Sequence, residues 1–448
     1  MIKKTTLLLL CCAVVLGAGA YYFDWKRGQL EKPPEDALKP AYSFHAADVV
    51  SIAIAHPASV GEPDIHLEKR SGVWQIVGPI QTLADQSTIN GIVDQIAAAE
   101  VTQTEPDTAD RRRAYGLDPP RISAEWQLQN GAKHTLFLGD KDFAGDSAYA
   151  IVDGGQNVSL LPDLLATGLA KGVDGLRDRA VLHVDSAQVT SLSLKSSSGD
   201  LALTKEKGEW MFTKPSPARG SADAVNSLLQ AVGSANWTAV ANEGPENLPG
   251  YGLVSPAITF ATVDSTGAKS TLLVGKKEGK AYFARDLSRS VVFSIDEDLH
   301  TKLSQGLDDL RDKSVVHATA ADIEQIQMRN ASGSIVLTRK KDSPDEWVFE
   351  APGDQKGKSA AGDKILDSIT ALQAEQVIDH PAANMSAQLA SPALSALLTD
   401  KNGKALTIRF SKPSGDFVYA QTSDGPSLYK LKKQLVDNLN FKPADLVF

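Results

Sequence analysis

The chain has 448 residues, of which 42% are hydrophobic and 23% charged, a balance typical of folded globular protein and unlike that of a disordered chain. Its formal net charge is −9, from 46 basic and 55 acidic residues, and neither sign forms a long block, so nucleic acid is not an expected partner. The only cysteines, Cys11 and Cys12, leave none for a disulfide or a thiolate metal site in the rest of the chain.

The first predicted element is a transmembrane helix within residues 1–23. Lys3 and Lys4 precede an uncharged stretch from Thr5 to Phe23, which as a helix would span roughly 28 Å, close to the ~30 Å hydrocarbon core of a bilayer. A basic start before an apolar run is also the form of an export signal. We therefore expect a single-pass inner-membrane protein whose soluble part lies in the periplasm or otherwise outside the cytoplasm.

Cleavage of this segment is an alternative that the sequence leaves open. Ala18 and Ala20 would suit a signal-peptide cleavage site, which would give a secreted form. Residues 24–43 follow and are rich in proline and poor in apolar residues. They are predicted to form a short, semi-extended linker.

The rest of the chain repeats one unit of about 136 residues. The repeat predicts copy one at 44–182, copy two at 183–316 and a divergent copy three at 317–448. The recurring residues include the prolines Pro120, Pro256 and Pro392, the hairpin glycines Gly131, Gly267 and Gly403, and the tryptophans Trp74, Trp210 and Trp347.

The elements of copy one follow from hydrophobic periodicity. Alternation predicts three antiparallel strands between residues 50 and 76, and a helical pattern predicts a helix over about 85–100. Four more strands follow, two of them flanking a tight turn at Asn130-Gly131, and then a second helix over 162–176. The predicted fold class is α+β, with a mostly antiparallel sheet and two helices in each copy.

Three sequence features occur together: W-x-[IF]-x-x-P after the first strands, Y-G-L-x-x-P after the helix, and a strand that ends in glycine. They are carried by Trp74, Pro79, Tyr115, Gly116, Leu117, Pro120 and Gly139 in copy one and by Trp210, Pro215, Tyr251, Gly252, Leu253, Pro256 and Gly275 in copy two. With this combination the chain resembles the bacterial family of domains of unknown function numbered 4340, over nearly all of its length after the linker. Copy three departs, because Ala387 and Gln388 replace tyrosine and glycine and Ser411 replaces the strand-ending glycine.

The resemblance implies an uncharacterised envelope protein. Some relatives are associated with transport systems of the ATP-binding-cassette (ABC) type. The resemblance therefore implies an extracytoplasmic accessory subunit that contacts a protein partner, which is an argument by analogy.

Motifs for chemistry are weak. Residues 353–359 read Gly-Asp-Gln-Lys-Gly-Lys-Ser, but a phosphate-binding loop needs four residues between its glycines and this segment has three. The eight histidines form no metal-binding pattern, and His183 and His317 recur at equivalent positions, which favours packing. No G-x-S-x-G motif is present. The sequence therefore predicts no cofactor, no metal and no enzymatic activity.

Two recurring motifs remain as candidate sites. We interpret the Tyr-Gly-Leu motif as a structural turn, with tyrosine and leucine on the core and glycine at positive φ, and keep a partner contact as the alternative. We interpret the Arg-Asp motif as a charge pair that joins one copy to the next. The candidate residues are Tyr115, Gly116, Leu117, Tyr251, Gly252, Leu253, Arg177, Asp178, Arg311 and Asp312.

The predicted function is that of a non-enzymatic interaction or accessory subunit in an envelope complex. Two other hypotheses stay open: a periplasmic ligand-binding or hydrolytic domain acting on envelope glycan or lipid, and a purely structural spacer.

Overall fold

The computed structural model describes residues 38–57, 61–244 and 246–447. The transmembrane helix expected within residues 1–23 and most of the linker lie outside these residues. Within the described part of the chain, no helix is both long and apolar enough to cross a membrane. The chain divides into two compact units, residues 1–179 and 180–448, and the second contains both copy two and copy three.

Each copy forms a nine-stranded sheet in which every described pairing is antiparallel, and the spatial order of the strands is the same in all three. The first sheet is β5 (Thr82–Leu83), β4 (Val73–Gly78), β3 (Ile65–Arg70), β2 (Val49–Ala55), β8 (Ile122–Leu128), β9 (Lys133–Lys141), β10 (Ser147–Val152), β11 (Asn157–Pro162) and β7 (Gln103–Pro106). The second is β15 (Ala218–Arg219), β14 (Glu209–Lys214), β13 (Gly199–Glu206), β12 (Val189–Ser196), β17 (Ile258–Asp264), β18 (Lys269–Glu278), β19 (Ala281–Asp286), β20 (Val292–Ile295) and β16 (Ala239–Asn242). The third is β24 (Ser359–Ala360), β23 (Ser343–Ala351), β22 (Gly333–Lys340), β21 (Ile323–Asn330), β26 (Leu394–Asp400), β27 (Ala405–Phe410), β28 (Phe417–Thr422), β29 (Leu428–Lys432) and β25 (Gln376–Ile378). The predicted repeat of mostly antiparallel α+β units is confirmed.

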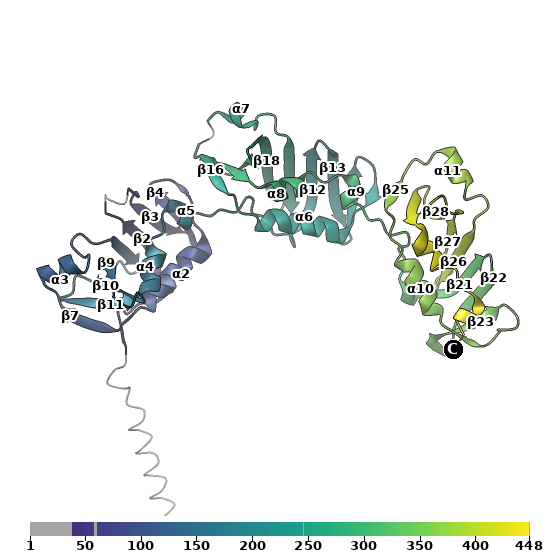
Figure 1. Cartoon of the computed structure of the whole chain (residues 1–448), viewed down its shortest axis with the longest axis horizontal. Helices are drawn as coiled ribbons and strands as arrows, with labels where there is room; N and C mark the ends of the chain where they lie inside the picture. Colours follow the sequence, from purple (N-terminus) through teal and green to yellow (C-terminus); the bar gives the residue numbers. More distant parts are fainter. Residues whose placement is uncertain (1–37, 58–60, 245, 448) are drawn as a thin grey trace, which may run out of the picture. The chain divides into compact units, whose positions relative to one another are not determined.

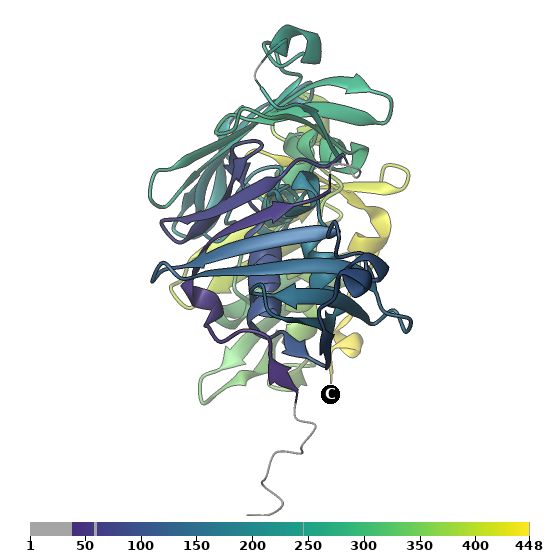
Figure 2. The ribbon, with the colours of Figure 1, turned by 90° about the vertical axis from the view of Figure 1, so that its left-hand side faces the viewer.

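One long helix covers one face of each sheet, as Figure 1 shows for α2 (Gln86–Ala97), α6 (Ala222–Ser234) and α10 (Gly362–Thr370). Asp85 begins α2 by accepting a hydrogen bond from the Thr88 amide at 2.6 Å. The apolar stripe expected from the sequence is buried, and it consists of Ile89, Ile92, Val93 and Ile96. In Figure 2 the blue strands of copy one show the twist that is usual for such sheets.

The single second helix predicted over 162–176 is wrong. The structure has two short helices, α4 (Asp163–Leu169) and α5 (Val173–Leu176), because Gly172 between them is extended, with φ −71° and ψ 179°. Glycine loses more conformational entropy in a helix than other residues do, so Gly172 favours a break between the two helices. Copy two has the same break between α8 (Glu297–Leu303) and α9 (Leu307–Leu310), and copy three has one short helix, α12 (Lys433–Asp437).

The remaining described elements are short. Three brief helices precede or contain the Tyr-Gly-Leu positions. Single 3₁₀ turns lie directly before the first long strand of copies one and three and near the C-terminus. They are α3 (Ala109–Ala114), α7 (Leu248–Tyr251), α11 (Ala383–Ala387), η1 (Ala46–Asp48), η3 (Ala320–Asp322) and η4 (Pro443–Asp445).

The predicted linker, residues 24–43, ends earlier than the sequence suggested. Lys39 and Pro40 form β1 (Lys39–Pro40), which pairs with β6 (Glu100–Val101), and the side chain of Tyr42 is buried in the core of copy one. In all three copies the segment before the first long strand, the leading segment, donates a backbone hydrogen bond to a residue just after the long helix. The donors are the amides of Ala41, Val181 and Val315, and the acceptors are the carbonyls of Ala99, Ala235 and Leu372. The leading segment is therefore part of each folded copy.

A tryptophan anchors each core in the same way. Trp74, Trp210 and Trp347 are at most 2% exposed, and each pairs across neighbouring strands with a basic residue whose charged group lies over the indole ring. The cation-to-ring distances are 5.5 Å for Lys69, 5.8 Å for Lys205 and 4.4 Å for Arg339. The recurrence of these tryptophans therefore reflects packing.

Candidate functional site

The Tyr-Gly-Leu turn takes the same backbone conformation in copies one and two. Gly116 has φ +66° and Gly252 has φ +73°, the left-handed region that favours glycine. Leu117 and Leu253 follow and are buried.

The turn is locked to a glycine inside a strand of the same sheet. The expected strand end at this glycine is wrong, because β9 runs past Gly139 to Lys141 and β18 runs past Gly275 to Glu278. A β-carbon built on Gly139 would lie 2.0 Å from the carbonyl oxygen of Tyr115, and one on Gly275 would lie 2.1 Å from that of Tyr251. In copy one the same carbonyl accepts a hydrogen bond from the Asp140 amide at 2.7 Å. The two motifs therefore recur together because one backbone rests on the other.

Copy three has neither the tyrosine-glycine pair of the turn nor the strand glycine. Ser411 stands where the other copies have glycine, is 2% exposed, and its hydroxyl oxygen accepts a hydrogen bond from the Tyr419 amide at 3.0 Å. Leu389 is still buried. A β-carbon is tolerated here because the turn that would collide with it has been replaced.

The sequence predicted that the tyrosine and leucine pack on the main core, and this prediction is wrong. In copy one they belong to a small separate cluster with Ile151 and Val158. Because side chains alternate along a strand, this cluster lies on the sheet face opposite to α2. The turn therefore covers the face that the helix leaves open.

The tyrosine rings are held differently in the two copies. Tyr115 stacks on Tyr149 with centroids 3.8 Å apart, and its hydroxyl donates to Glu105 at 2.9 Å. That hydrogen bond to a carboxylate raises the pKa of Tyr115 above its ordinary value. Tyr251 instead meets Phe283 edge-on at 4.8 Å.

The Arg-Asp motif at 311–312 reaches into copy three within the second compact unit. Arg311 is 7% exposed and donates two hydrogen bonds to Asp379, at 2.9 and 3.0 Å, and this pairing lowers the pKa of the Asp379 carboxyl. Asp312 accepts from the Ser314 amide at 2.8 Å and lies 3.4 Å from His317. The arginine and aspartate thus have separate partners.

The corresponding Arg177 and Asp178 lie at the end of α5 and are also buried. Arg177 lies 3.2 Å from Asp174, and its backbone bridges to Ala84, as Arg311 bridges to Gly220. The sequence could not have identified Asp379 as a partner, because no spacing or motif links it to Arg311.

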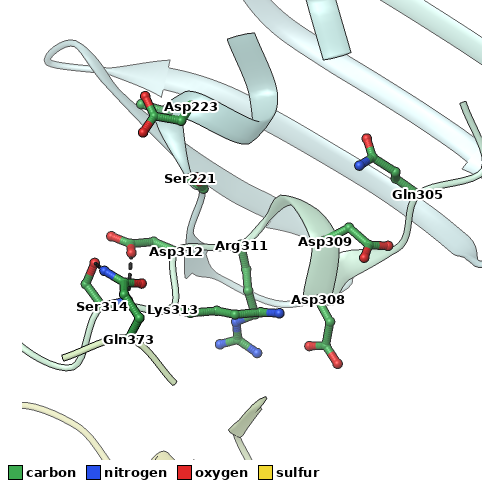
Figure 3. Close-up of a pocket in the computed structure, with 11 residues that line it drawn as sticks. Ser221, Asp223, Gln305, Asp308, Asp309, Arg311, Asp312, Lys313, Ser314 and Gln373 are labelled. Carbon is green, nitrogen blue, oxygen red and sulfur yellow. Dashed lines mark hydrogen bonds between the residues drawn. The ribbon is translucent and has the colours of Figure 1, made fainter. Parts of the chain in front are cut away.

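An open polar hollow of about 590 Å³ lies beside Arg311. Figure 3 shows that Asp308 and Asp309 come from α9 and Asp223 from the start of α6. In the same view Asp312 points toward Ser314, and the Arg311 guanidinium points away from Asp312. The residues that line the hollow are Ser221, Ala222, Asp223, Gln305, Asp308, Asp309, Arg311, Asp312, Lys313, Ser314 and Gln373. In the described part of the chain, no group of three or more His, Cys, Asp or Glu side chains is placed to hold a metal ion.

Comparison with known families agrees with the repeat. The profile of one family matches residues 74–220, 210–392 and 347–447, so each match begins at the anchoring tryptophan of a copy. No curated protein matches the chain. Matches that together span most of its length show that the chain belongs to the family described as domain of unknown function (DUF4340).

Proposed function

We propose that this protein is a non-enzymatic accessory subunit, tethered to the inner membrane by its N-terminal apolar segment, whose repeated sheets contact another component of an envelope complex such as an ABC-type transport system. The observation that carries the proposal is that the most distinctive recurring residues have structural contacts. Tyr115 packs its backbone on Gly139, and Trp74 packs in the core beneath the Lys69 side chain. Repetition of a scaffold favours an extended binding surface over a reaction site.

The alternative is a periplasmic domain that binds or hydrolyses envelope glycan or lipid. The polar hollow beside Arg311 favours it, since sugars and headgroups need convergent polar groups. Against it, Arg311 is already paired with Asp379 and Asp309 already accepts from the Gly306 amide.

Purification from membranes in mild detergent tests the proposal. The full-length chain is expected to co-purify with one membrane protein in a constant ratio, and a strain that lacks the chain is expected to lose part of the corresponding transport. A chain lacking residues 1–23 serves as the control and is expected to lose most of this association. A chain that purifies alone, from cells in which its deletion leaves transport unchanged, would contradict the proposal.

A further inference from the structure

Copy one contains an aromatic cluster at the start of its fold. Tyr42 meets Trp126 edge-on at 4.7 Å, and His134 stacks with Phe44 at 5.4 Å and with Trp126 at 5.8 Å. Asp153 fixes the histidine ring through its Nδ1 at 2.9 Å. Four rings thus fill the space between the leading segment and strands β8 and β9.

The same place in copy three has lost its rings. Trp126 pairs with His134 across β8 and β9, and the corresponding pair across β26 and β27 is Leu398 with Leu406. Phe44 lies two residues before η1, and Ala318 lies two residues before η3. Three aromatic side chains of copy one are therefore replaced by two leucines and an alanine.

These replacements coincide with a hollow of about 370 Å³. Ala318, Leu398 and Leu406 supply apolar lining, and Leu398 is fully buried. Around them lie polar side chains that already have local partners: Asp322 binds Lys401 at 2.6 Å, and Asp400 accepts from the amides of Asn402 and Lys404. The remaining lining residues are His317, Thr319, Ile323, Ala405, Ser423 and Asp424.

We propose that this hollow is a binding site for an aromatic side chain presented by a partner protein. The fold demonstrates in copy one that rings fit between the leading segment and these two strands. An apolar floor with a polar rim matches the pockets that receive aromatic anchors at protein interfaces. The inference rests on the proposed function, because it names the chemistry by which a partner would be held.

Weak binding of a free aromatic probe tests the site without the partner. The full chain, with its Ala and Leu methyl groups labelled for NMR, is titrated with N-acetyltryptophan amide, and N-acetylalanine amide is the control probe. Shifts of the Ala318, Leu398 and Leu406 methyl signals are expected with the tryptophan probe, at an affinity at least ten times higher than with the alanine probe. The absence of such shifts in a folded chain would overturn the proposal.

Filling variants supply the matched control. Ala318→Phe and, separately, Leu398→Trp put the copy-one residues back and are expected to weaken probe binding at least tenfold. Two variants are used because one could fail to fold. If both fold and the probe binds unchanged, the proposal is overturned. Since the probe reports on the hollow alone, failure to find a membrane partner would contradict the proposed function and leave this result standing.

Discussion

The carbonyl oxygen of Tyr115 occupies the place where a β-carbon on Gly139 would have to stand, with only 2.0 Å between them. The two residues are far apart in sequence, and the contact recurs between Tyr251 and Gly275. It explains why the turn motif and the strand glycine occur together in copies one and two and are lost together in copy three.

Gly139→Ala is expected to destabilise copy one by about 3 kcal/mol, because the β-carbon meets backbone that cannot move aside cheaply. Hydrogen exchange measured by mass spectrometry should show faster exchange around the Tyr-Gly-Leu turn, with copy three unaffected. Gly91→Ala is the control: nothing lies within 4 Å of its β-carbon position, so a gain of up to about 1 kcal/mol is expected in the helix. Equal effects of the two changes would refute the account of the contact.

Asp379→Ala leaves the Arg311 guanidinium buried without its carboxylate. We expect a loss of about 2 kcal/mol in the unfolding free energy of copy three, less than for a fully buried pair because the Asp379 side chain is 32% exposed. Glu346→Ala is the control and removes an ion pair with Lys340 on the surface, where the two side chains are 55% and 51% exposed. It is expected to lower the unfolding free energy by about 0.5 kcal/mol or less. Urea denaturation of each variant measures the difference, and a negligible effect at Asp379 would count against a joining role for this pair.

The same pair makes stability depend on acid. The pKa of Asp379 is lowered in the folded state, so its contribution is fully present above its unfolded pKa of about 4 and is lost as the pH falls through the folded value. Asp379→Asn should therefore show a shallower loss of stability below about pH 4 than the wild-type chain. Thermal unfolding between neutral and acidic pH checks this, and parallel curves for both chains would contradict it.

Glu105→Gln tests how the Tyr115 ring is fixed. The carboxylate of Glu105 raises the tyrosine pKa by accepting its hydrogen bond, so a neutral amide should let Tyr115 ionise at lower pH. NMR of the labelled tyrosine ring during an alkaline titration follows the change. A Tyr115 ring signal that titrates at the same pH in both chains would contradict this role of Glu105.

Repetition and periodicity in the sequence predicted the three similar sheets and the long helix of each copy. The amphipathic stripe of α2 and the hairpin at Asn130-Gly131 came directly from spacing. The two-residue strand β5 and the edge strand β7 were missed, because such short segments have no readable alternation. The docked residues around Tyr42 were missed as well, since prolines nearby suggested an open linker.

The site was less predictable. The sequence marked Tyr115, Gly139 and Arg311 as recurring residues. It could not show that the Tyr115 carbonyl rests on Gly139 or that Arg311 pairs with Asp379, because both are tertiary contacts. The repeat spacing already aligns Trp126 with Leu398 and His134 with Leu406. That these smaller side chains leave a hollow beside Ala318 depends on tertiary packing, which the sequence does not show.

The central claim is that the repeated sheets contact a partner in the envelope. Its most direct test places a photo-crosslinking amino acid at single exposed positions of the full-length chain in living cells. These include Lys404 beside the copy-three hollow and, as the control, Ser332 in the turn at the opposite end of β21 from Ile323, which lines the hollow. We predict a discrete crosslinked product with one membrane protein from Lys404 and none from Ser332. Equal products from both positions, or none from any exposed position tested, would contradict it.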